Sequence, residues 1–122
     1  MTVQSYELAR RAAEAALSKK ARDIVLLDVS TLSDVTDYFV LCTGDSDTQV
    51  KAIADAVEDQ LLTVERGHPR KEGVTHLQWV LLDYFNVVVH VFQPRVREFY
   101  DIERLWGDAV REEITDETPA LA

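Results

Sequence analysis

Hydrophobic positions recur with different periods along the first half of the chain, and these periods predict its elements. Apolar residues lie at helical spacing in 6–17 and in 50–61, and "SDTQ" (46–49) has the form of a capping box before the second helix. Short β-branched runs at 23–29 and 38–42 predict two strands. Because nearly every position of these strands is apolar, we expect both of their faces to be buried.

The second half of the chain contains a strongly apolar segment, "WVLLDYFNVVVHVF" (79–92), which predicts two strands joined by a tight turn. Asn86 tolerates the left-handed conformation that this turn needs, whereas Phe85 does not adopt it easily. The polar stretch 68–78 has room for one short edge strand. Apolar positions in 94–106 lie at helical spacing and predict a single last helix. The acidic residues 108–122 are expected to form a flexible tail, so that the folded domain spans 1–107.

This order of elements predicts an α/β (α+β) domain with a single mixed sheet of about five strands flanked by helices. The last two strands are expected to form an antiparallel hairpin, because only a tight turn joins them. The strands on either side of the second helix can pair in parallel through a right-handed crossover.

The composition and charge fit one globular domain that avoids nucleic acid. A chain of 122 residues with 47% hydrophobic residues can bury a core of its own. Its net charge is −9, and no Lys or Arg occurs between Arg22 and Lys51, so DNA is not an expected partner. This window is consistent with a solvated acidic face, a cation site or a patch that meets a basic partner, and its acidic residues are Asp23, Asp28, Asp34, Asp37, Asp45 and Asp47.

The sequence also predicts a cytoplasmic location. No stretch approaches the roughly 20 apolar residues that a membrane span needs. The polar, alanine-rich N-terminus lacks the apolar segment of a secretory signal. Cys42 is the single cysteine, so the chain can form no internal disulfide, which suits a reducing compartment.

The turn "TGDSD" (43–47) is a first candidate for chemistry, because a strand that runs into a helix N-terminus can bind phosphate. Nucleotidyltransferases combine such a turn with strand-borne carboxylates that hold Mg²⁺. Here Asp45 and Asp47 lie at the turn and the helix cap, where they would repel phosphate. Capping by Ser46 and Asp47 is the favoured interpretation.

Three other arrangements could in principle carry catalysis or metal, but their sequence context is weak. Asp83 and His90 could act as acid and base, yet Asp83 beside a turn most simply accepts turn N–H groups. Cys42 has no activating neighbours and is expected to be an inert buried thiol. The histidines His68, His76 and His90 lack metal-ligand spacing. We therefore expect no catalytic residue, no metal site and no cofactor.

The surplus of apolar surface in 79–92 favours a binding sheet. Both faces of this hairpin are hydrophobic, and Trp79 is a typical interface anchor. We expect helices to cover the opposite face and leave Trp79 partly exposed in a patch that binds a partner protein. The expected partner-binding residues are Trp79, Leu81, Asp83, His90 and Phe92. The alternative is a sheet that helices cover fully on both sides.

Four stretches together resemble a known family. They occur in its order and spacing over roughly residues 5–107, and read "DYFVLCTGDSDTQVKAIAD", "KEG", "WVLLDYFNVVVHVF" and "REFYDIERLW". In these motifs the chain resembles the Iojap-like ribosomal silencing factors, whose Trp and His match Trp79 and His90. One departure is Phe85-Asn86, where the family usually has Gly-Asp, and it puts the hairpin turn and any role of that Asp in question.

The resemblance implies a nucleotidyltransferase-like fold without the catalytic carboxylates, and hence no enzyme activity. It further implies a translational repressor that binds the large ribosomal subunit through ribosomal protein L-fourteen and blocks association with the small subunit. It also implies a cytoplasmic location and a homodimer when the protein is free. The alternatives are a large-subunit assembly factor that uses the same contact and, more remotely, a nucleotidyltransferase-like enzyme.

Overall fold

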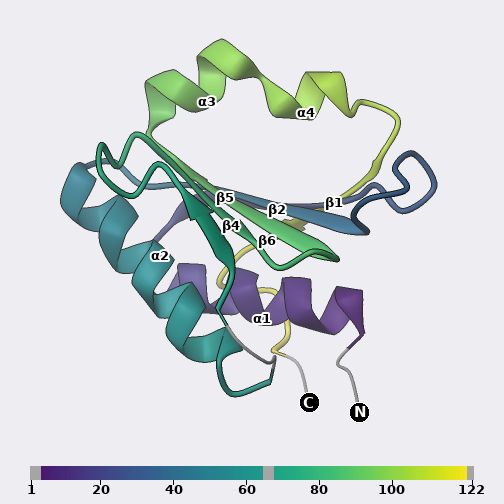
Figure 1. The fold of residues 1–122 in the computed structure, drawn as a ribbon, viewed down its shortest axis with the longest axis horizontal. Coiled ribbons are helices and arrows are strands. Elements are labelled where there is room, and N and C mark those ends of the chain that lie inside the picture. The colour runs from purple at the N-terminus through teal and green to yellow at the C-terminus, as the bar shows by residue number, and fades with distance from the viewer. Residues whose placement is uncertain (1–3, 65–67, 121–122) are drawn as a thin grey trace.

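The computed structural model describes residues 4–64 and 68–120, which form one mixed sheet with helices on both faces (Figure 1). The helices are α1 (Ser5–Ser18), α2 (Asp47–Leu61), α3 (Pro94–Tyr100) and α4 (Ile102–Leu105). The strands are β1 (Arg22–Asp28), β2 (Tyr38–Thr43), β3 (Arg70–Glu72), β4 (Trp79–Asp83), β5 (Val87–Phe92) and β6 (Val110–Ile114). Among the described residues, none of the helices is long and apolar enough to cross a membrane.

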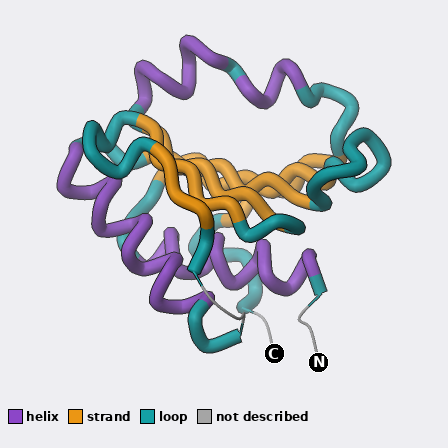
Figure 2. The backbone as a smooth tube through the Cα atoms, viewed as in Figure 1, coloured by secondary structure: helices purple, strands orange, loops and turns teal. Residues whose placement is uncertain are grey.

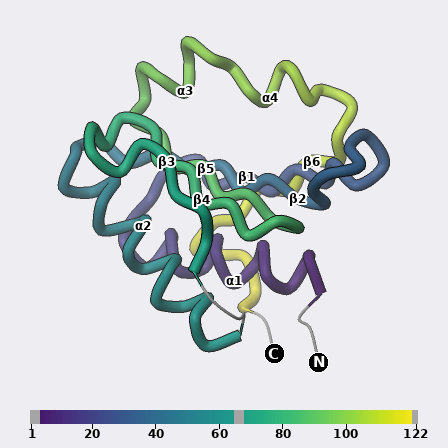
Figure 3. The backbone as a smooth tube through the Cα atoms, viewed as in Figure 1, coloured from purple at the N-terminus to yellow at the C-terminus, as the bar shows by residue number. Residues whose placement is uncertain are grey.

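The sheet has the strand order β3-β4-β5-β2-β1-β6. Strands β4 and β5 form the antiparallel hairpin that the sequence predicts. The one parallel pair among the described strands joins β2 to β5. Our expectation that the strands flanking the second helix pair in parallel is therefore wrong in its partner, because the chain runs outward through β3 and β4 before β5 returns beside β2 (Figure 3).

The two faces of the sheet are covered to different extents (Figure 2). Helices α1 and α2 pack on one face, the α1–α2 face, where the larger cluster of buried side chains lies. Helices α3 and α4 arch over the other, the α3–α4 face, and neither contains a fully buried residue. The expectation that helices pack only on the face opposite Trp79 is wrong, because Trp79 belongs to the smaller cluster on the α3–α4 face.

Helices α1 and α2 form where the hydrophobic periodicity predicts them. The buried side of α1 is mostly alanine, with Leu8 and Arg10 as its large buried residues among those described. Alanine favours the helix and permits close approach to α2 and the sheet. At the start of α2, the Ser46 hydroxyl accepts the Gln49 N–H at 3.1 Å, and the Gln49 side chain accepts the Asp45 N–H at 2.7 Å. The predicted N-terminal cap is thus confirmed.

The predicted last helix is interrupted. Asp101 adopts a left-handed conformation with φ 47°, and its N–H donates to the Arg97 carbonyl at 2.9 Å, which closes α3. Aspartate tolerates this conformation better than most residues, and α4 starts immediately afterwards. The interruption lets the segment bend over the sheet, and it carries Trp106 back to the strands.

Part of the segment expected to be a flexible tail forms β6, an antiparallel edge strand beside β1. Ile114 is buried in the core cluster, and the Tyr6 hydroxyl donates to the Glu112 carboxylate at 3.0 Å. Four of the five residues of β6 remain exposed or half-buried, so its sequence looks like a solvated tail. Backbone pairing with β1, rather than a hydrophobic pattern, defines this strand.

The β4–β5 turn uses its residues differently from the prediction. We expected Asn86 to adopt the left-handed conformation, but Phe85 does so, with φ 82°. The Asp83 carboxylate accepts the Phe85 N–H at 2.8 Å, which confirms its predicted role in the turn. The Asn86 side chain instead donates to the Ser5 hydroxyl at 3.0 Å and ties the turn to α1. The Phe85 ring is left 81% exposed at the edge of the α3–α4 face.

Candidate partner-binding site

The strand register brings the five predicted binding residues onto one face. Trp79 pairs with Phe92 and Leu81 with His90 across the β4–β5 hairpin, and Asp83 continues the same side of β4. Because side chains alternate along a strand, all five lie on the α3–α4 face. Their grouping follows from the period of the sequence and from the tight turn that sets the register.

A hydrogen bond joins the two most distinctive residues of this group. The Trp79 indole N–H donates to His90 Nδ1 at 3.1 Å. The Trp79 ring also contacts the rings of Phe92 and Tyr100, with centroids 5.0 and 4.9 Å apart. Trp79 is therefore held in place from the sheet below and from α3 above, while its side chain remains half-buried.

His90 is neutral in this environment. Its side chain is 5% exposed, and burial lowers the pKa of the imidazole to about 4, which the nearby Asp83 carboxylate only partly opposes. Phe39 contacts its ring edge-on, with centroids 5.1 Å apart. His90 is thus a buried, neutral imidazole that the hydrogen bond from Trp79 holds in one orientation within the aromatic cluster.

Next to this cluster the α3–α4 face is hollowed by a cavity of about 730 Å³. Its volume falls in the range typical of pockets that bind small molecules or side chains. Leu81, Asp83 and His90 line it together with residues from the 33–36 loop, β2, β3, the β4–β5 turn, β5 and the end of α4. These include Val35, Thr36, Phe39, Arg70, Glu72, Phe85, Val88 and Trp106. Val35 and Phe85 at the rim are 77% and 81% exposed. The helices on this face therefore leave an apolar surface uncovered beside Trp79.

The five predicted residues occupy different depths. Leu81 and Asp83 are half-buried at the cavity, as Trp79 is beside it, whereas Phe92 is fully buried beneath them. In this conformation Phe92 can support Trp79 but offers no surface to a partner. Sequence reasoning missed Val35, Phe39 and Trp106, because they reach the cavity from distant segments. The binding role of the five residues stays a prediction.

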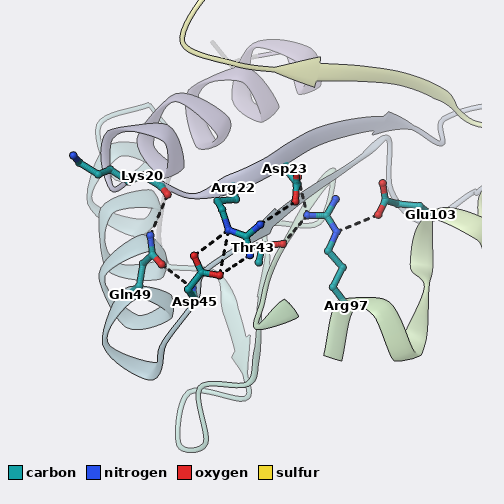
Figure 4. A network of polar contacts seen from close by, with 8 residues as sticks. All are labelled: Lys20, Arg22, Asp23, Thr43, Asp45, Gln49, Arg97 and Glu103. Atoms are coloured by element: carbon teal, nitrogen blue, oxygen red, sulfur yellow. Dashed lines mark hydrogen bonds and ion pairs between the residues drawn. The ribbon is translucent and has the colours of Figure 1, made fainter. Parts of the chain in front are cut away.

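The other candidate site, the turn before α2, is occupied by an ion-pair network (Figure 4). The Arg22 guanidinium donates to the Asp45 carboxylate, with Nε and Oδ2 2.9 Å apart, and this hydrogen bond lowers the pKa of Asp45. Asp47 accepts a hydrogen bond from the Gln93 side chain at 2.5 Å. Both carboxylates that could have held Mg²⁺ for nucleotidyl transfer thus have partners within the protein.

The same network ties α3 and α4 to the sheet. Arg97 donates to the Asp23 carbonyl at 2.7 Å and to the Thr43 hydroxyl at 2.9 Å (Figure 4). Its Nε donates to the Glu103 carboxylate at 3.1 Å, and Arg111 of β6 also pairs with Glu103. The Arg97 side chain is only 12% exposed, and its hydrogen bonds to Asp23 and Thr43 join α3 to the sheet.

Neither a thiol site nor a metal site emerges from the side chains. Burial raises the pKa of the Cys42 thiol to about 12, and the thiol donates a weak hydrogen bond to the backbone carbonyl of His90, at 3.7 Å. The interpretation of Cys42 as an inert buried thiol is therefore supported. Within residues 4–64 and 68–120, no group of three or more His, Cys, Asp or Glu side chains lies close enough to hold a metal ion.

Comparison with known proteins identifies the family. The family model described as "Ribosomal silencing factor during starvation" matches residues 2–121. The chain belongs to the ribosomal silencing factor family. The resemblance to the Iojap-like ribosomal silencing factors, drawn from four short motifs, is thereby confirmed over nearly the whole chain.

Curated members of the ribosomal silencing factor family extend from bacteria to plastids. Ribosomal silencing factor RsfS of Bacillus subtilis is 46% identical over 80% of this chain and 83% of its own. The relative from Chromobacterium violaceum is 43% identical over 86% of each chain. The chloroplast protein Iojap of Zea mays is 36% identical over 87% of this chain and 46% of its own length.

Solved structures give the same fold for this silencing factor. A crystal structure of a Chromobacterium violaceum protein superposes with a TM-score of 0.83 at 37% identity, covering 97% of this chain and 96% of that one. A crystal structure of a Bacillus halodurans protein gives a TM-score of 0.77 at 36% identity, and the match covers 89% of this chain and 99% of that one. The predicted class, a single mixed sheet flanked by helices, is confirmed, with six strands rather than about five.

Proposed function

We propose that the protein is a translational repressor that binds the large ribosomal subunit through ribosomal protein L-fourteen and prevents joining with the small subunit. The observation that carries this proposal is the match to the ribosomal silencing factor family over residues 2–121. An ion-paired turn before α2 and an inert Cys42 agree with a binding protein rather than an enzyme.

The cavity beside Trp79 is the docking surface that best fits this function. Its apolar lining can receive side chains of a partner, while Asp83 and Glu72 add negative charge. The net charge of −9 favours a basic ribosomal protein over ribosomal RNA. In this arrangement Leu81 and Asp83 contact the partner directly, and Phe92 supports the Trp79 ring from below.

Sedimentation with separated ribosomal subunits tests the proposal directly. The protein is expected to pellet with large subunits and to remain in the supernatant with small subunits. Adding the protein to a mixture of both should reduce the fraction of joined ribosomes. Binding to neither subunit, or to both equally, would contradict the proposed function.

Replacing Leu81 with glutamate is expected to weaken binding by about thirtyfold or more while the fold survives. Leu81 is half-buried at the cavity and lies outside the Trp79 ring cluster, so a charge there meets the partner rather than the core. A buried, unpaired carboxylate at the centre of an interface costs about 2 kcal/mol or more, or a loss of affinity of about thirtyfold. Co-sedimentation and circular dichroism measure binding and fold.

The matched control is Leu62→Glu, the same substitution at a partly exposed leucine that follows α2. It should bind large subunits like the unaltered protein. Normal binding of Leu81→Glu, with a normal circular dichroism spectrum, would place the interface elsewhere.

The salt dependence of binding distinguishes protein from RNA as the partner. A contact with ribosomal protein L-fourteen predicts only a mild fall of affinity between low and physiological salt. A protein that neutralises many phosphates instead loses about a thousandfold or more over a similar range. Affinities measured at several salt concentrations provide the slope, and a steep slope would indicate ribosomal RNA as the main partner.

A further inference from the structure

Two buried polar atoms on the cavity side of the sheet lack a partner. His90 Nε2 and Thr36 Oγ1 have no hydrogen bond within the described part of the chain. Both residues line the cavity, and they are only 5% and 6% exposed. Tyr84 also lines the cavity and has an unpaired hydroxyl, but its ring packs against the core cluster on the α1–α2 face. Buried polar atoms are normally hydrogen-bonded, so two unpaired ones beside the same cavity indicate that a ligand group belongs there.

The hydrogen bond from Trp79 determines what His90 can offer. An indole N–H can only donate, so the Nδ1 atom that accepts it must be unprotonated. A neutral imidazole then has its proton on Nε2. The unpaired atom at the cavity is therefore a donor, and it requires an acceptor oxygen. The Thr36 hydroxyl can donate or accept and can serve the same incoming group.

The charges around the cavity restrict the nature of that acceptor. Asp83 and Glu72 line it and outnumber Arg70, so the lining carries a net negative charge that opposes an incoming carboxylate or phosphate. A neutral carbonyl oxygen meets no such repulsion. The apolar lining from Phe39, Leu81 and Trp106 suits an apolar side chain next to that carbonyl. A loop of a protein, with one apolar side chain and a free backbone carbonyl, combines both features.

We propose that, in the complex required by the proposed function, a loop of the ribosomal protein inserts an apolar side chain into the cavity and accepts a hydrogen bond from His90 Nε2–H through a backbone carbonyl. Thr36 Oγ1 is the second polar contact of the inserted loop. Trp79 then acts as a positioning residue, because its N–H selects the His90 tautomer that donates. The inference deepens the proposed function by naming what the cavity recognises.

The variant Thr36→Val tests the polar contact, since it keeps the shape of the side chain and removes only the hydroxyl. Loss of one buried hydrogen bond at the interface should weaken binding to isolated ribosomal protein L-fourteen about fivefold to tenfold. The melting temperature of the free protein should stay unchanged or rise, because the hydroxyl has no partner within the described residues. Thr31→Val, the same change at an exposed site of the neighbouring loop, is the matched control and should alter neither quantity.

Nitrogen-15 NMR of labelled histidine tests the contact at His90 itself. The free protein should show an unprotonated Nδ1 and a protonated Nε2, and the Nε2–H proton should move downfield when the ribosomal protein is added. Unchanged affinity of Thr36→Val, reduced affinity together with a lower melting temperature, a proton on Nδ1, or an unmoved Nε2–H signal would each overturn the inference. If the unaltered protein binds neither large subunits nor the ribosomal protein, the proposed function itself is wrong.

Discussion

Replacing Gly73 with alanine is expected to destabilise the protein by about 3 kcal/mol, even though the residue is exposed. Gly73 has φ 79°, a conformation that favours glycine. A Cβ atom added there would lie 1.9 Å from the Trp79 carbonyl oxygen, much closer than any real contact. The obstacle is backbone, so no side-chain rotation can relieve the clash.

The clash should be relieved by movement of β3 and the turn that follows it. Strand β4 is paired on both sides, whereas β3 is a three-residue edge strand that pairs only with β4 among the described strands. We therefore expect β3 to separate from β4. Because β3 carries Arg70 and Glu72 to the rim of the cavity, binding to large subunits should weaken as well.

Urea unfolding gives the change in the free energy of unfolding, and amide exchange at residues 70–72 locates the loss. Gly107→Ala is the matched control, since its added Cβ would meet only the Arg104 carbonyl oxygen at 3.3 Å. The free energy of unfolding of that variant should differ from that of the unaltered protein by less than about 1 kcal/mol. Equal stabilities of the two variants would contradict the steric argument.

Local pattern was sufficient for much of this fold. Helix α2 has both a capping box and a regular apolar spacing, and the β4–β5 hairpin has two apolar strands around a short turn. These features are decided by neighbouring residues, so they can be read from sequence. The interruption of the last helix could not be read from sequence, because it depends on the single left-handed residue Asp101. Strand β6 could not be read either, because it depends on pairing with the distant strand β1.

The candidate site was predictable to a similar degree. Alternation along two strands places Trp79, Leu81 and His90 on one face, whatever the rest of the chain does. The cavity itself is a tertiary feature, because Val35 and Trp106 line it from segments that lie far apart in the sequence. No local signal reports such an approach. The sequence gives a partial indication of Phe85, because a large aromatic residue at a tight turn is unusual. In the structure Phe85 has φ 82° and its ring is exposed.

Acidification from pH 6.5 to pH 4 is expected to remove about 3 kcal/mol of stability through His90 alone. Burial lowers the pKa of folded His90 to about 4, whereas an unfolded histidine titrates near 6.5. Between these values the unfolded chain binds a proton that the folded protein does not, so stability falls as pH decreases. Above pH 6.5 the effect vanishes, and below about pH 4 it levels off. Each pKa unit corresponds to about 1.4 kcal/mol, which yields the stated magnitude.

Free energies of unfolding measured across this range, for the unaltered protein and for His90→Asn, isolate the contribution of His90. Asparagine does not titrate, and its side-chain oxygen can still accept the Trp79 N–H. The variant should be less stable at pH 7 but should lose less stability on acidification, because the contribution of His90 is then absent. An NMR titration of His90 in the unaltered protein measures its pKa directly, even if the variant fails to fold. A value near 6.5, or parallel pH profiles for the two proteins, would show that the imidazole is hydrated rather than buried in the aromatic cluster beside the cavity.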